Sequence, residues 1–217
     1  MQSRGQRGGV IQRKAYFVVG MGCDTSSGER WMLSMEEQIL DLDAFTNVEI
    51  VCNNSKLRTF FNIGKSLCSL HPAKTSEFVV SITEKIKKDL QNPDTYVWIA
   101  GHSYGGAVVS RVAEHIQEAA GILPEGALRR IQMHTFAPIY ICPGDRVRDL
   151  QIHHIMKLGD IALKCINIKP DPAITTNHND ATHHITFYEK PTGRSQWQIH
   201  NSYLNDILGF FSTAIPQ

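Results

Sequence analysis

The sequence predicts a single α/β domain in which a mostly parallel sheet carries helices on both faces. Short apolar runs rich in β-branched and aromatic residues recur along the chain, and such runs are typical of strands buried on both sides. Amphipathic segments with helical spacing alternate with several of these runs. This alternation is characteristic of α/β folds. No linker rich in Pro, Gly or Ser divides the chain, so we expect one compact domain over residues 15–217 behind a flexible N-terminal tail, residues 1–14.

Each element follows from its local pattern. The predicted strands are short apolar runs bounded by Gly, Pro, Asn or Asp, at residues 15–19, 48–52, 96–100, 131–136, 152–158 and 185–189. Ser34 and Glu37 form a capping-box pattern, which predicts a helix that opens there and ends near Leu42. Further helices are predicted over residues 76–91, 105–120 and 202–211.

The composition excludes several classes of partner. The 217 residues include 22 Lys and Arg against 21 Asp and Glu, a net charge of +1, which argues against a nucleic-acid or anionic-membrane partner. No apolar run reaches the roughly 18 residues of a membrane span, and the N-terminus lacks a signal-peptide pattern. The five cysteines are odd in number and form no CxxC pair, so we expect reduced thiols, no stable membrane insertion and a cytoplasmic location.

The segment Gly101-His102-Ser103-Tyr104-Gly105 carries the strongest functional signal. An apolar run precedes it and a helical pattern follows it, as in the nucleophile elbow of a hydrolase. Gly101 and Gly105 lack the Cβ atoms that would collide where strand and helix approach each other. Ser103 is therefore the predicted nucleophile. The amide of Tyr104, at the helix N-terminus, is a predicted donor to an oxyanion.

A serine nucleophile needs a general base later in the chain. His200 follows the last predicted strand and a short connection, and it precedes the final helix. A loop in that position lies above the carboxyl edge of the sheet, so His200 is the preferred base. His183 and His184 remain alternatives.

The base needs a carboxylate that orients it. Asp160 directly follows Gly159 at the end of an apolar strand, where its carboxyl group could reach the histidine. Asp145 lies in a Pro-Gly-Asp turn and Asp149 in a charged run, and both remain rivals. Asp171 and Asp180 lie in a loop rich in Pro and Asn. We therefore prefer Asp160.

These motifs together resemble the class 3 lipases, a family with the α/β-hydrolase fold. The resemblance spans residues 16–203 and rests on Gly-His-Ser-Tyr-Gly-Gly at 101–106, Thr-Phe-Ala-Pro at 135–138, Gly-Asp-Ile at 159–161 and a late histidine. It implies an α/β-hydrolase-like fold with Ser103 as nucleophile, Asp160 as acid and His200 as base.

The chain departs from that family at two places. The Arg-Gly-Thr segment of the family, which supplies part of the oxyanion hole, is replaced by the loop at residues 20–25. We therefore assign the second oxyanion donor to the amide of Met21 or Gly22. The Asp-Ile-Val-Pro segment after the acid reads Asp-Ile-Ala-Leu at 160–163. The short chain leaves little room for a lid, which favours an esterase over a long-chain lipase.

The predicted function is hydrolysis of a small-molecule or lipid ester through an acyl-enzyme on Ser103. Thioesterase, amidase and acyltransferase activity use the same residues and remain alternatives, as does a non-catalytic binding module. No cofactor is expected. The group His178, Asp180, His183 and His184 lacks the spacing of a specific metal site, so no metal is expected either. The oligomeric state stays open.

Overall fold

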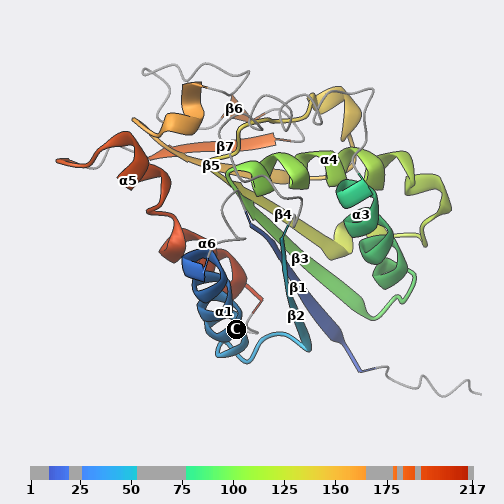
Figure 1. Ribbon diagram of the computed structural model, residues 1–217. Helices are drawn as coiled ribbons and strands as arrows, with labels where there is room; N and C mark the ends of the chain where they lie inside the picture. The colour runs from blue at the N-terminus through green and yellow to red at the C-terminus, as the bar shows by residue number, and fades with distance from the viewer. Residues whose placement is uncertain are drawn as a thin grey trace, which may run out of the picture.

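A computed structural model describes residues 10–19, 26–52, 77–164, 178–179, 183–188 and 192–214. Within them, seven strands form one sheet in the order β2-β1-β3-β4-β5-β7-β6 (Figure 1). Neighbouring strands are parallel except β6 and β7, which are antiparallel. The predicted mostly parallel sheet is therefore confirmed. The strands are β1 (Gln12–Val18), β2 (Asn47–Val51), β3 (Thr95–His102), β4 (Ile131–Phe136), β5 (Ile152–Lys157), β6 (His178–Asn179) and β7 (His183–Tyr188).

Helices cover both faces of this sheet, as predicted. On one face lie α3 (Glu77–Leu90) and α4 (Tyr104–Glu118), and on the other lie α1 (Ser26–Leu40) and α6 (Leu204–Ser212) (Figure 1). A short helix, α5 (Gln196–His200), precedes α6. No helix among the described residues has the length and hydropathy to cross a bilayer.

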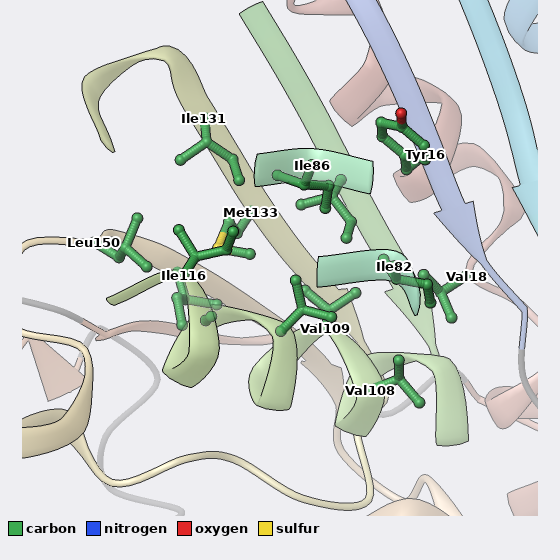
Figure 2. Packing of buried hydrophobic residues seen from close by; sticks show 14 of the residues in the cluster. Tyr16, Val18, Ile82, Ile86, Val108, Val109, Ile116, Ile131, Met133 and Leu150 are labelled. Atoms are coloured by element: carbon green, nitrogen blue, oxygen red, sulfur yellow. The ribbon is translucent and has the colours of Figure 1, made fainter. Parts of the chain in front are cut away.

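Successive side chains of a strand point to opposite faces of the sheet, so the interior is divided into two hydrophobic cores. In β1, Tyr16 packs in the core beneath α3 and α4, whereas Phe17 packs in the core beneath α1 and α6. This is the period-two pattern of a strand buried on both faces. Figure 2 shows the first core, in which Ile82 of α3 and Val109 of α4 face the sheet. The central strand β3 is almost entirely buried, so its C-terminal end is held firmly from both sides.

The structure corrects two expected boundaries, the start of the first strand and the start of the first helix. β1 begins at Gln12, so residues 12–14 belong to the sheet rather than to the tail. α1 begins at Ser26, and Ser34 therefore lies inside the helix rather than at its start. There its hydroxyl and main-chain oxygen accept hydrogen bonds from Gln38 at 2.9 and 3.0 Å, so the supposed capping pattern is a contact within a helix.

The expectation that all cysteines are reduced is wrong for one of them. Cys52, directly after β2, is disulfide-bonded, and its partner is outside the described part of the chain. Cys142 is free and buried. Burial, reinforced by the charge of Glu114, raises the pKa of the Cys142 thiol to about 12.

Candidate active site

Ser103 lies at the tight turn between β3 and α4. Its backbone has φ 58° and ψ −119°, a conformation that residues other than glycine rarely adopt. Its N–H donates to the main-chain oxygen of Phe136 at 2.9 Å, which ties the turn to the end of β4. The hydroxyl side chain is thus carried above the carboxyl edge of the sheet, as expected of an elbow.

The two predicted elbow glycines lie where no side chain fits. A Cβ on Gly101 would lie 2.3 Å from the main-chain oxygen of Gly105. A Cβ on Gly105 would lie 2.0 Å from the main-chain oxygen of Val18. The next residue, Gly106, faces Pro138, and a Cβ added to Gly106 would lie 3.0 Å from the Cβ of Pro138. Because α4 packs this closely against β1 and β3, the position of Ser103 relative to the sheet is fixed.

Asp160 follows β5 at a turn in which Gly159 has φ 85°. The carboxylate is almost completely buried, with its side chain 1% exposed. Its Oδ1 accepts the N–H of Ala162 at 2.7 Å, at the start of a 3₁₀ turn. Its Oδ2 is buried and has no hydrogen-bond partner of conventional geometry among the described residues.

His200 is the last residue of α5, not part of an irregular loop as expected. A capping box opens this helix, because Ser195 accepts the N–H of Gln198 and the Gln198 side chain accepts the N–H of Ser195. The imidazole of His200 is buried between the other two predicted residues. Its Nε2 lies 2.9 Å from Ser103 Oγ and its Nδ1 lies 2.8 Å from Asp160 Oδ1.

The hydrogen-bond chemistry fixes the tautomer of His200. A carboxylate can only accept, so Nδ1 carries the proton that is donated to Asp160. The unprotonated Nε2 of the neutral ring can then accept the hydroxyl proton of Ser103. The arrangement can therefore withdraw a proton from Ser103 and hold the resulting positive charge beside a buried carboxylate.

Of the alternative residues, Asp171 and Asp180 fall outside the described part of the chain, and the other four lie elsewhere in the structure. Asp145 belongs to a 3₁₀ turn, and Asp149 accepts a hydrogen bond from Gln117 of α4 at 2.8 Å. His183 and His184 lie in β7, where the backbone register pairs His184 with His153. Among the described residues, the imidazole of His200 makes its hydrogen bonds with Ser103 and Asp160.

Tyr203 and Lys157 support the site, and neither was identified from the sequence. The Tyr203 hydroxyl accepts the N–H of Lys157 at 2.6 Å. Burial, and next the charge of Asp160, raise the pKa of Tyr203 well above its usual range, so the phenol stays protonated. The Nζ of Lys157 donates to the main-chain oxygen of Ser202 at 2.6 Å and pairs with Asp206 at 2.7 Å. The apolar–polar pattern of β5 gives no signal for these contacts, which depend on the position of a distant helix.

The predicted oxyanion donors are only partly described. Tyr104 is the first residue of α4, and its side chain is buried in the core beneath that helix. Met21 and Gly22 fall outside the described residues. In the part of the chain that is described, no group of three or more His, Cys, Asp or Glu side chains is arranged to hold a metal ion.

Comparison with known proteins shows a likeness of fold. No protein-family model and no curated protein matches the chain, so the resemblance to class 3 lipases gains no support from them. An acetyl xylan esterase structure has a TM-score of 0.51 at 12% identity, over 95% of this chain and 97% of that one.

Two further solved structures are similar over most of their length. A poly(3-hydroxybutyrate) depolymerase from Bordetella parapertussis has a TM-score of 0.49 at 11% identity, over 97% of this chain and 84% of that one. An S-formylglutathione hydrolase from Agrobacterium tumefaciens has a TM-score of 0.48 at 11% identity, over 95% of this chain and 86% of that one. The chain has an α/β-hydrolase-like fold. At such low identity the fold is all that the likeness shows.

Proposed function

We propose that the chain is a serine hydrolase that cleaves carboxylic esters through an acyl-enzyme on Ser103. The observation that carries this proposal is the continuous hydrogen-bonded series Ser103 Oγ, His200 Nε2, His200 Nδ1 and Asp160 Oδ1. The strained backbone of Ser103 adds to it, because a residue that only capped a helix would have no need of φ 58°.

In the proposed reaction, Ser103 Oγ attacks the ester carbonyl carbon while its proton passes to His200 Nε2. Asp160 stays ionised and stabilises the imidazolium. The bond to the leaving oxygen then breaks as His200 returns the proton to the departing alcohol. A water molecule gives a proton to His200, attacks the acyl carbon and releases the acid, and the proton returns to Ser103.

The negative oxygen of each tetrahedral intermediate needs donors that are already in place. The amide of Tyr104, at the N-terminal end of α4, is the first proposed donor. The amide of Met21 or Gly22 is the proposed second. Both would act at the carboxyl edge of the sheet, beside the turn that carries Ser103.

Short acyl esters are the first substrate class to test. One solved structure of similar fold is named an acetyl xylan esterase. Ser103 and His200 are only 7% and 6% exposed, so the reacting groups are accessible to a narrow acyl group more readily than to a bulky one. Thioesters and transfer to an acceptor other than water use the same proton relay, and a substrate panel distinguishes them.

The decisive experiment combines Ser103→Ala with a fluorophosphonate probe. We expect the wild-type protein to be labelled at Ser103 and to hydrolyse p-nitrophenyl acetate, with kcat falling by at least about 10³-fold in the variant. Ser110→Ala is the matched control, since Ser110 is a buried serine of α4 whose hydroxyl donates to the Tyr140 main-chain oxygen at 3.3 Å. An unlabelled wild-type protein without turnover would support a binding module instead.

A further inference from the structure

His102 connects the elbow directly to the helix that carries His200. It is the last residue of β3 and immediately precedes Ser103. Its Nε2 lies 2.8 Å from the main-chain oxygen of His200. The two imidazole rings also lie close together, with 4.8 Å between their centroids and 38° between their planes. The turn between β3 and α4 therefore contacts His200 at two points. Ser103 binds its side chain, and His102 binds its main-chain oxygen.

The direction of this hydrogen bond is fixed by its acceptor. A carbonyl oxygen cannot donate, so Nε2 of His102 carries the proton. Burial, and then the neighbouring His200, lower the pKa of His102 to about 4, which keeps the ring neutral at neutral pH. A charged ring at this distance would oppose the imidazolium that forms on His200 during catalysis.

The acceptor, the main-chain oxygen of His200, lies at the C-terminal end of α5, where a donor from outside the helix can stabilise it. His200 ends α5, a helix of five residues. The last carbonyl groups of a helix have no partners within it, and so short a helix has little stability of its own. Two residues further on, the main-chain oxygen of Ser202 is held by Lys157 Nζ at 2.6 Å. The end of α5 is thus fixed by side chains from β3 and β5.

We propose that His102 is a positioning residue, which holds the backbone of His200 so that its Nε2 stays within hydrogen-bond distance of Ser103 Oγ. This role rests on the proposed function, since a base displaced from its serine matters only if the serine reacts. Misplacement by about 1 Å can lower a rate by about 10²-fold. Tyr203, whose ring lies 5.7 Å from that of His102, limits how far the His102 ring can move.

Three substitutions of His102 distinguish the effect of its hydrogen-bond donor from the effect of its ring volume. His102→Phe keeps an aromatic ring but removes the donor. His102→Gln places an amide nitrogen near the position of Nε2, whereas His102→Asn carries the same amide on a side chain one methylene shorter. With p-nitrophenyl acetate we expect the Phe and Asn variants to lose about 10- to 100-fold in kcat with KM changed less than about threefold. The Gln variant should retain most of the wild-type kcat.

Equal losses in the Gln and Asn variants would overturn the positioning role, and so would full activity of the Asn and Phe variants. Because the Phe variant carries the larger risk of misfolding, the Gln and Asn pair decides the question by itself. Thermal unfolding of each variant shows whether a loss of kcat accompanies a loss of stability.

A spectroscopic signal tests the same inference without turnover. The Nδ1 proton shared by His200 and Asp160 should give a strongly downfield proton NMR resonance in the wild-type and Gln proteins, and the signal should broaden or disappear in the Asn and Phe proteins. An identical resonance in all four proteins would overturn the positioning role. Absence of fluorophosphonate labelling in the wild type would instead overturn the proposed hydrolase function, while the resonance still reports the position of His200.

Discussion

Gly105, the first-turn residue of α4 that faces β1, approaches the main-chain oxygen of Val18 so closely that a Cβ would lie 2.0 Å from it. Because both partners are backbone, neither can yield without moving the strand or the helix. We expect Gly105→Ala to displace the N-terminal turn of α4 and with it Ser103. The fluorophosphonate labelling rate should fall by at least about 10²-fold, and the protein should unfold several degrees lower in a thermal melt.

Gly209→Ala is the matched control for this prediction. Gly209 lies in α6, and among the described residues a Cβ there would meet no atom within 4 Å beyond the adjoining backbone of the helix itself. Alanine is favoured over glycine in helices by roughly 1 kcal/mol, so this variant should be at least as stable as the wild type and should label normally. Equal behaviour of the two variants would contradict the close approach at Gly105.

Replacing Tyr203 by Phe removes the acceptor of the Lys157 N–H and leaves that amide unpaired beside the buried Asp160. We expect a loss of about 1–3 kcal/mol in the free energy of unfolding, together with a several-fold fall in kcat because the end of β5, which leads into Asp160, loses this hydrogen bond. Urea unfolding and esterase kinetics measure the two effects. Tyr96→Phe, at a partly exposed tyrosine of β3, should change neither.

Stability should fall in acid because of His134. Burial, and then the neighbouring His153, lower the pKa of His134 from 6.5 to about 3, and its ring stacks on those of His153 and Phe210. The unfolded chain therefore binds a proton below pH 6.5 that the folded chain accepts only near pH 3. The free energy of unfolding should decrease through this window, by up to about 1.4 kcal/mol per pH unit for this one group.

His134→Phe should make the pH dependence shallower while preserving the stacked ring. Urea unfolding at several values between pH 4.5 and pH 8 measures the slope. His102, whose pKa is also lowered, contributes equally to both proteins and does not obscure the comparison. The same slope in variant and wild type would show that His134 is not the source.

The two described cysteines should differ in reactivity toward iodoacetamide. Cys142 is buried with a raised pKa, so almost no thiolate forms near neutral pH and the folded protein should resist alkylation there. Unfolding without reductant should expose Cys142 alone of this pair, and reduction should then expose Cys52. Peptide mass spectrometry reads both positions. Alkylation of Cys52 in the unfolded, unreduced protein would contradict the disulfide.

Local patterns in the sequence were enough to predict the sheet and the elbow. Apolar runs identified six strands, because parallel strands buried on both faces need continuous apolar segments. β6 escaped detection because it is only two residues long. α5 escaped because its Trp-Gln-Ile-His run is too short to show helical periodicity.

The order of Ser103, Asp160 and His200 along the chain allowed the three to be chosen, and the structure brings them together. The contacts of His102, Lys157 and Tyr203 could not be predicted in the same way. Each joins segments far apart in sequence, such as His102 and His200, and depends on where α5 lies relative to the sheet. A histidine beside a serine in the elbow motif gives no indication of which backbone oxygen it will meet.

The proposed nucleophile Ser103 and its proposed base His200 are separated by 97 residues, and His200 comes later in the chain. A chain that is synthesised from its N-terminus therefore displays Ser103 long before it carries His200. Under the proposed mechanism, Ser103 has no general base during that interval, so we expect it not to be acylated. The same mechanism predicts that Ser103 becomes reactive only after α5 packs beside the turn between β3 and α4. The time course of fluorophosphonate labelling at Ser103 during refolding should therefore report when α5 reaches its native position.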